Sequence, residues 1–188
     1  TRLRDETEFK PKPLVEIGGM PILWHIMKIY SYYGVKDFIL CLGYKGHMIK
    51  DFFMNLDVYN ADITFNPKTK RTQHHNNLDI DDWDITFAET GLETGTGGRV
   101  KRVEKYVDED DFFLTYGDGV SDVNISNLLK FHKSHGKIGT VTAVKPLAKF
   151  GVLHLNGGIV MDFTKKIVTY GNRIDGGFFV FKRKVFDY

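Results

Sequence analysis

The first part of the chain places two cations, Arg2 and Lys12, in a polar segment that leads into a predicted apolar helix. Lys12 stands between two prolines in the run 10–13, and the apolar residues begin at Leu14. Guanidinium and ammonium groups pair with phosphate oxygens, so fixed cations in such a loop can bind a polyphosphate. By charge alone, however, a solvated basic loop is the preferred interpretation, and the choice depends on the rest of the chain.

A carboxylate that could complement these cations follows an apolar run later in the sequence. Residues 112–120 read FFLTYGDGV, so Asp118 stands between two glycines where a strand is predicted to end. Ligands of open α/β sheets bind outside the carboxyl ends of the strands, and a carboxylate there can hold Mg²⁺ together with phosphate oxygens. A simple Gly-Asp-Gly turn explains Asp118 equally well by itself. The basic loop upstream favours metal binding.

A glycine- and threonine-rich segment, residues 89–102, lies between these two motifs. Its sequence is ETGLETGTGGRVKR, in which glycines let the backbone approach a ligand and threonines offer hydroxyl groups. A predicted helix follows, and its positive N-terminal end would favour an anion. A flexible helix entry with no ligand is the alternative.

The spacing of apolar residues predicts the elements that must position these groups. Helices are expected at 22–33, 47–55, 97–107 and 125–135, and strands at 35–42, 62–65, 84–88, 112–116, 139–144, 151–155, 158–163 and 174–181. The alternation predicts a single α/β domain over residues 1–188, with a Rossmann-like, mostly parallel sheet flanked by helices. The strand-rich last third predicts a small antiparallel layer towards the C-terminus. The most polar segment, residues 66–82, is predicted to be an exposed loop or arm.

Composition excludes several classes of protein. The 188 residues suffice for one domain with a sizeable core, and 42% hydrophobic and 27% charged residues are ordinary globular values. The net charge of +2, with cations spread along the chain, gives no reason to expect nucleic-acid binding. The single cysteine, Cys41, lies in an apolar run and is predicted to be a buried structural thiol. With no membrane-length apolar stretch and no visible signal peptide, a cytoplasmic protein without a membrane partner is expected.

The order of the motifs resembles the sugar-1-phosphate nucleotidylyltransferases, which join a nucleoside triphosphate to a sugar phosphate. TRL followed by PKPLVEIGGMPIL carries the resemblance first. Further segments in the same order resemble the cytidylyltransferase members: VKDFILCLGYKGHMIKDFF, DDWDITFAETG, TGGRVKRV, FFLTYGDGVSDV and DGGFFVF. Together they cover essentially the whole chain. The implied fold is of the nucleotide-diphospho-sugar transferase type.

This resemblance implies a reaction and a set of site residues. CTP and glucose 1-phosphate would give CDP-glucose and pyrophosphate with Mg²⁺ as cofactor, for deoxysugar and surface polysaccharide biosynthesis. Arg2 and Lys12 would be the catalytic cations, with Lys12 nearest the attacked phosphorus. By position in the family's motifs, the nucleotide would contact Thr1, Arg2, Lys12, Thr94 and Arg99, the metal would be held by Asp118, and the sugar phosphate would face Gly117, Lys165 and Asp175.

The chain departs from the family pattern in its last third. The family carries a segment resembling EKP where this chain has TKK at 164–166, which leaves Lys165 without the usual neighbouring glutamate. The family's NGGFF appears as DGGFF, so Asp175 replaces an asparagine that contacts the sugar. The assignment of Lys165 and Asp175 to the sugar phosphate therefore depends on the surrounding motifs, because the family's own residues are not all present there.

The family pattern also extends beyond the two ends of this sequence. It implies a first strand with a glycine-rich LAGGxG turn before Thr1, and a second metal-binding aspartate beyond a helix that starts near Val185. We expect the first strand to belong to the protein, because deleting a central strand would ruin the core. A homo-oligomer is expected on family grounds, with the arm 66–82 as a possible intersubunit contact. Three alternatives to the implied reaction stay open. The enzyme could use another nucleotide or another sugar phosphate, or the chain could be a regulatory module that binds sugar nucleotides without turning them over.

Overall fold

The structure is a computed structural model that describes residues 9–75, 82–145, 152–164 and 173–188. These residues form two units. The first contains residues up to 109 together with 117–125, and the second contains residues 110–116 and 126–188. Each unit is described by itself below. Thr1, Arg2 and Lys165 lie outside the described residues.

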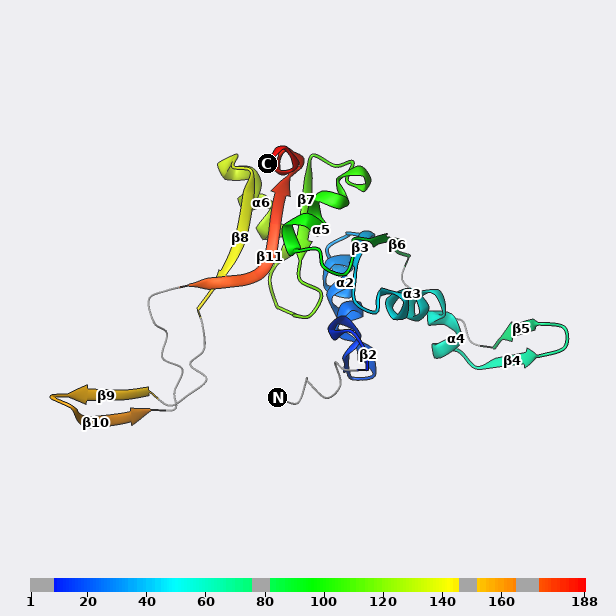
Figure 1. Cartoon of the computed structure of the whole chain (residues 1–188), viewed down its shortest axis with the longest axis horizontal. Coiled ribbons are helices and arrows are strands. Elements are labelled where there is room, and N and C mark those ends of the chain that lie inside the picture. The colour runs from blue at the N-terminus through cyan, green and yellow to red at the C-terminus, as the bar shows by residue number, and fades with distance from the viewer. Residues whose placement is uncertain (1–8, 76–81, 146–151, 165–172) are drawn as a thin grey trace. The chain divides into compact units, whose positions relative to one another are not determined.

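The first unit contains a parallel pair of strands with helices around it (Figure 1). β3 and β6 are paired in parallel from Asp37↔Asp84 to Leu42↔Glu89, which confirms the parallel pairing that the alternation predicted. In chain order the elements are η1 Lys12–Leu14, β1 Glu16–Ile17, β2 Met20–Pro21, α2 Ile22–Tyr32, β3 Asp37–Leu42, α3 Gly46–Met54, α4 Leu56–Asn60, β4 Ile63–Asn66, β5 Arg71–His74, β6 Asp84–Glu89, α5 Thr96–Arg102 and η2 Glu104–Tyr106.

The hydrophobic core of this unit forms where α2 meets β3 and α3. Its buried side chains are Leu14, Leu23, Met27, Leu42 and Ile49, and the half-buried aromatic rings of Phe38, Phe52, Phe53, Trp83 and Phe87 pack against them. Leu23 and Met27 are four residues apart, so they lie on one face of α2. The helix ends at Tyr32, one residue before the predicted end, and Gly34 follows with a φ of +88°, which an L side chain rarely adopts.

The helix α2 begins at residue 22, as predicted, directly after a short hairpin. Pro21, the last residue before the helix, pairs with Glu16 in the short β1–β2 hairpin. Gly18 and Gly19 form the tip of this hairpin with φ of +60° and +85°. Two consecutive positive φ angles are what a two-residue hairpin turn requires. The helix therefore begins at Ile22, whose N–H donates to Val15 O at 2.8 Å.

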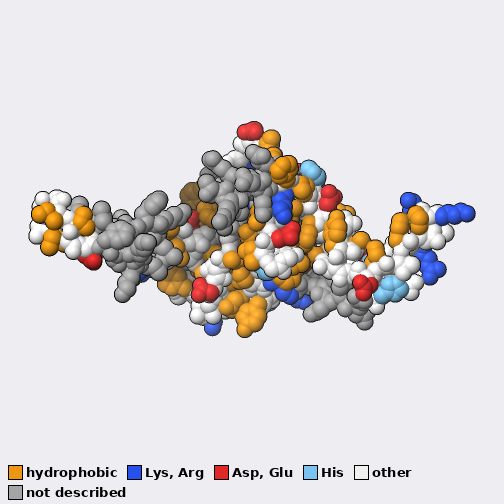
Figure 2. Space-filling view, turned by 90° about the horizontal axis from the view of Figure 1, so that it is seen from below, with side chains coloured by type: hydrophobic (Ala, Val, Ile, Leu, Met, Phe, Trp, Pro, Cys, Tyr) orange, Lys and Arg blue, Asp and Glu red, His pale blue; other side chains and the backbone are white. Residues whose placement is uncertain are grey.

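The polar segment 66–82, predicted to be a loop or arm, contains a strand that the spacing did not predict. β4 and β5 form an antiparallel hairpin, and the Asn66 side chain accepts hydrogen bonds at 3.0 Å from the N–H groups of Lys68 and Thr69 at its turn. All four residues of β5 are exposed and polar, so no apolar alternation marks the strand in the sequence. Lys and Arg side chains gather at this hairpin, on the right in Figure 2.

The second unit is built on an antiparallel sheet. The strands β7 Asp111–Thr115, β11 Ile174–Lys182 and β8 Gly139–Val144 lie in the order β7-β11-β8. Helix α6 Ile125–His135 and η3 Arg183–Asp187 pack with the sheet, and β9 Val152–Asn156 pairs with β10 Ile159–Thr164 in a hairpin. The antiparallel layer expected in the last third is therefore confirmed. β7, which the alternation places with the parallel strands, pairs with β11 in the antiparallel sense.

The core of this unit contains a buried histidine among apolar side chains. Phe178, Val180 and Phe186 are buried, and the rings of Phe112 and Phe186 stack with centroids 5.3 Å apart. His132 on α6 is fully buried, and its Nδ1 lies 2.7 Å from Thr140 Oγ1 on β8. Among the described residues, no helix is both long and apolar enough to cross a bilayer.

Candidate functional site

The predicted phosphate-binding cation and the predicted metal-binding carboxylate lie close together. Lys12 Nζ is 3.8 Å from Asp118 Oδ2, although 106 positions separate the two residues in the chain. The side chain of Lys12 is 66% exposed and that of Asp118 is 47% exposed. This distance is too long for a hydrogen bond, so the pair presents two opposite charges side by side to solvent.

The local fold of the proline loop explains why Lys12 is exposed. Pro11 and Leu14 are buried on either side of it. The 3₁₀ turn closes with hydrogen bonds from Leu14 N to Pro11 O at 2.9 Å and from Val15 N to Lys12 O at 3.0 Å. Anchoring the turn at its apolar residues holds the intervening lysine on the surface.

Gly117 is needed for the close approach of the two loops. A Cβ added to Gly117 would lie 3.3 Å from Pro13 Cγ, which is tighter than most such contacts. A larger residue at this position would push the Asp118 loop away from the proline loop. The structure therefore gives Gly117 a positioning role in addition to the sugar contact that the family resemblance implies.

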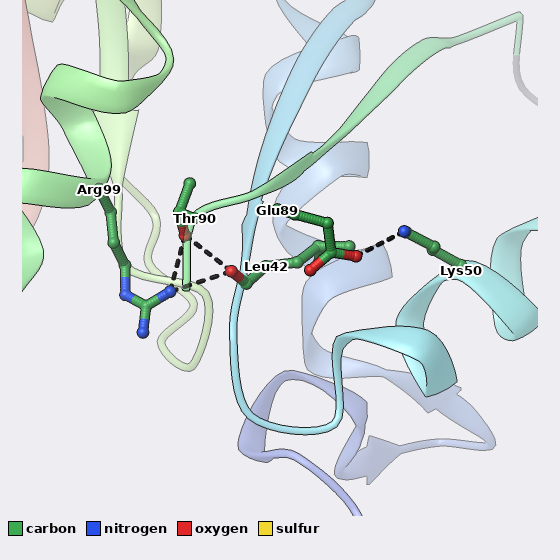
Figure 3. Close-up of polar contacts among 5 residues, drawn as sticks. All are labelled: Leu42, Lys50, Glu89, Thr90 and Arg99. Atoms are coloured by element: carbon green, nitrogen blue, oxygen red, sulfur yellow. Dashed lines mark hydrogen bonds and ion pairs between the residues drawn. The ribbon is translucent and has the colours of Figure 1, made fainter. Parts of the chain in front are cut away.

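The carboxyl ends of β3 and β6 form a second polar cluster, which Figure 3 shows. Thr90 follows β6 and is buried, and both its N–H and its hydroxyl donate to Leu42 O, at 3.0 and 2.7 Å. Beside this contact, Lys50 on α3 forms an ion pair with Glu89. The start of the glycine- and threonine-rich loop is thus fixed to the end of the neighbouring strand.

Arg99 reaches into this cluster from α5. Its Nη1 donates to Leu42 O at 3.0 Å and to Thr90 Oγ1 at 2.7 Å, and its Nη2 donates to Leu92 O at 3.0 Å. By the family resemblance, Arg99 would contact the nucleotide. In the structure these three hydrogen bonds hold the guanidinium against the loop of its own chain.

Thr94 is held in the same way by a second arginine that the sequence analysis did not single out. Arg102 Nη1 donates to Thr94 Oγ1 at 2.8 Å and to the carbonyl oxygen of Thr90. Arg102 and Arg99 are three residues apart, so both lie on one face of α5. Their i,i+3 spacing after a glycine-rich loop is the sequence signal that could have identified the pair.

The thiol of Cys41 borders this cluster, and its environment is unreactive. Cys41 is half-buried, and its Sγ lies 4.0 Å from the carbonyl oxygen of Arg99. Burial raises the pKa of the Cys41 thiol above its ordinary value, and the Arg99 charge offsets this only in part. The thiol thus stays neutral near pH 7, in line with the structural role predicted for it.

In the second unit, Asp175 organises the backbone of β11. Its carboxylate accepts a hydrogen bond from Tyr116 OH at 2.9 Å and from Gly177 N at 2.7 Å. Gly177 has a φ of +79°, and an added Cβ would lie 3.0 Å from the Tyr116 ring. The register of β11 with β8 shifts between Asp175 and Phe179, so this double-glycine segment forms an irregularity in the strand.

Metal-binding capacity in the described part of the chain is limited. Over residues 9–75, 82–145, 152–164 and 173–188, no group of three or more His, Cys, Asp and Glu side chains could hold a metal ion. At a metal site, Asp118 would therefore be a single carboxylate ligand from the described part of the chain. Mg²⁺ is usually bound by one or two carboxylates together with phosphate oxygens and water, so Asp118 fits an ion that arrives with a nucleotide.

The fold and the paired loops define a class of protein, and comparison with known families identifies it. The nucleotidyl transferase family model matches residues 1–188. The chain belongs to this family, which confirms the enzyme class that the motifs predicted. A solved structure, HddC from Yersinia pseudotuberculosis, shares the fold with a TM-score of 0.62 at 22% identity, over 95% of this chain and 70% of that protein.

Curated relatives agree with the more specific resemblance. Glucose-1-phosphate cytidylyltransferases of Salmonella typhimurium and Salmonella typhi are each 50% identical to this chain over 188 residues. The alignments cover all of this chain and 73% of each relative. The resemblance to cytidylyltransferases predicted from the motifs is therefore confirmed.

Proposed function

We propose that this chain transfers a cytidylyl group from CTP to glucose 1-phosphate, giving CDP-glucose and pyrophosphate. The observation that carries the proposal is the placement of Lys12 beside Asp118 on two loops far apart in sequence. The names of relatives at 50% identity support the choice of substrates. In the reaction, a phosphate oxygen of glucose 1-phosphate attacks the α-phosphorus of CTP. The bond from that phosphorus to the β-phosphate bridging oxygen breaks, and pyrophosphate leaves.

The chain's own part in this reaction is to position anions and neutralise charge. Two phosphorylated substrates repel each other, and negative charge redistributes around the attacked phosphorus. Lys12, fixed by the buried residues of its turn, would contact the phosphates, together with Arg2 and Thr1. A positioned cation of this kind stabilises the transition state without forming a covalent bond.

Asp118 would hold Mg²⁺, and Gly117, Lys165 and Asp175 would contact the glucose 1-phosphate. When bound, the ion would draw negative charge from the phosphate oxygens that coordinate it. The Asp118 carboxylate supplies the hard oxygen donor that Mg²⁺ prefers, and its 47% exposure leaves room for phosphate and water.

The loop 90–95 would recognise the cytosine. It combines the hydroxyl of Thr94 with backbone groups that Arg99 and Arg102 hold in place. Recognition of a base requires donors and acceptors in fixed positions, because a mismatched base then leaves polar groups unpaired. A rigid loop is suited to that task.

The test is pyrophosphate release from the purified protein with Mg²⁺ and glucose 1-phosphate, comparing CTP, UTP, GTP and dTTP. Release largely confined to CTP is expected. Comparable release with another nucleotide would overturn the choice of base but keep the enzyme class. If no nucleotide were turned over but CTP raised the melting temperature, the protein would instead be a nucleotide-binding module.

A further inference from the structure

We propose that Tyr116 and Asp175 form a clasp that positions the loop carrying Asp118. This inference rests on the proposed function, because it concerns the metal-binding role of Asp118. It adds Tyr116 to the functional residues, and it gives Asp175 a positioning role besides the sugar contact that the family resemblance implies. Tyr116 directly follows β7 and stands two positions before Asp118 in the chain.

The clasp is formed by one carboxylate that accepts two hydrogen bonds. Asp175 Oδ2 accepts from Tyr116 OH at 2.9 Å, and Asp175 Oδ1 accepts from Gly177 N at 2.7 Å. Because each oxygen has its own donor, the orientation of the carboxylate is fixed, and the tyrosine is held with it. The Tyr116 ring also packs edge-on against Phe179, with centroids 5.8 Å apart. The carboxylate keeps further lone pairs, so the clasp is compatible with a ligand contact.

The backbone at the end of β7 is held by the same short segment of β11. Gly177 O accepts from Tyr116 N at 3.4 Å and from Thr115 Oγ1 at 2.9 Å. The register pairs Thr115 with Phe178, so these contacts lie where β7 ends. Tyr116 is therefore anchored through both its side chain and its backbone.

The irregular conformation of β11 is what allows the clasp to form. An aspartate that accepts from the N–H two residues further on forms an Asx turn, which a regular strand does not contain. Gly177 supplies the φ of +79° at this turn, and Figure 1 shows β11 bending near its start. Irregularities of this kind re-aim side chains beside functional sites. Here the strand departs from regular pairing where it contacts Tyr116.

The consequence for the proposed metal site follows from chain connectivity. The chain passes from the second unit to the first between Tyr116 and Gly117. Fixing Tyr116 limits the conformations of the residues that follow it, so the Asp118 loop loses less conformational freedom when an ion and a nucleotide bind. Without the clasp, a higher Mg²⁺ concentration should be needed, whereas the rate at saturating Mg²⁺ should change little.

The first test is Tyr116→Phe, which removes one hydroxyl group and keeps the ring. The Mg²⁺ concentration for half-maximal pyrophosphate release should rise about three- to tenfold, with kcat at saturating Mg²⁺ changed less than about threefold. Tyr106→Phe is the matched control and should change neither value, because Tyr106 is 43% exposed and Tyr116 is 45% exposed. An unchanged Mg²⁺ requirement in Tyr116→Phe would overturn the inference.

Two substitutions of Asp175 separate the clasp from the negative charge. Asp175→Asn keeps an oxygen for Gly177 N, and its amide can donate to Tyr116 Oη, so the clasp persists with reversed polarity. Asp175→Ala removes both hydrogen bonds. We expect the wild-type Mg²⁺ requirement in Asp175→Asn and a raised one in Asp175→Ala. Adding Tyr116→Phe to Asp175→Ala should raise it no further, because the two side chains act through each other. Equal defects in the Asn and Ala variants would overturn the inference.

Hydrogen exchange provides a readout that does not depend on catalysis. In the free protein, Asp175→Ala should speed the exchange of the Tyr116 and Gly177 amide protons at least about tenfold, and Asp175→Asn should not. Helix α2 should be unaffected in both variants. Unchanged exchange in Asp175→Ala would contradict the clasp even if the wild-type enzyme turned over CTP. Faster exchange in a protein whose wild type did not turn over CTP would support the clasp and contradict only the proposed reaction.

Discussion

At the residue scale, Lys12 combines high exposure with a fixed backbone. Its ion pair with Asp118 spans 3.8 Å between two largely exposed side chains, and such pairs contribute little to stability. The turn that carries Lys12 is stabilised instead by buried Pro11 and Leu14. The lysine can therefore be changed without unfolding its loop, which makes its role in turnover testable.

We expect Lys12→Ala to lower kcat by about 10²–10³, because it removes a cation that stabilises charge in the transition state. The melting temperature should change by no more than a few degrees. Steady-state pyrophosphate release and thermal denaturation measure the two effects. Lys10→Ala is the matched control, since Lys10 pairs with Glu16 at 3.1 Å in the same segment. Turnover by Lys12→Ala at the wild-type rate would show that the assignment is wrong.

The thiol of Cys41 gives a pH-dependent prediction. Burial raises its pKa, so the reactive thiolate forms at higher pH than in an exposed cysteine of pKa about 8.5. Iodoacetamide should therefore alkylate Cys41 in the folded protein much more slowly at pH 8 than in urea-unfolded protein. The folded-state rate should rise as the pH increases above 9. Equal rates in both states at pH 8 would contradict the buried environment.

At the element scale, a directed chain of hydrogen bonds connects α6 with β8. Lys137 N donates to His135 Nδ1, so in the neutral ring the proton of His135 is on Nε2, 2.8 Å from Thr140 Oγ1. The Thr140 hydroxyl then donates to His132 Nδ1. This leaves the His132 proton on Nε2, which faces Asp111 Oδ1 at 3.3 Å, although the angle there does not satisfy hydrogen-bond geometry.

Thr140→Val should destabilise the protein by about 1–3 kcal/mol, because it leaves the buried ring nitrogen of His132 and the half-buried one of His135 without their partner. Urea denaturation measures the change in the free energy of unfolding. Thr72→Val, an equivalent substitution on the exposed strand β5, should change the stability by less than about 0.5 kcal/mol. Equal stability of the two variants would show that the buried chain of hydrogen bonds contributes nothing.

The predicted elements agree with the structure where apolar spacing is strong. The predicted bounds of α6 and β8 match the observed ones, and those of β3 and β6 differ by no more than two residues. The prediction failed for β5, whose side chains are all polar, and it missed the short helix α4 that follows Asn55. Apolar periodicity reports burial, so an exposed hairpin strand gives no such signal.

At the scale of the whole molecule, each unit has its own core. The first is built around a parallel strand pair, and the second around an antiparallel sheet with a buried histidine. Large apolar side chains remain exposed on β10, at Ile159, Val160 and Met161. Figure 2 shows hydrophobic side chains on the surface of the β9–β10 hairpin. The homo-oligomer expected from the family resemblance stays a prediction.

The sequence by itself determined the class of the protein and the positions of most elements. Apolar spacing and turn residues are local properties of the chain, and the ordered motifs from TRL to DGGFFVF identified the family. Only the tertiary structure placed Lys12 beside Asp118, turned Arg99 and Arg102 towards their own loop, and paired β7 with β11. The contacts of Lys12 with Asp118 and of β7 with β11 join segments far apart in the chain, and hydrogen-bond geometry in the folded loop decides where the two arginines point, so local patterns cannot report them.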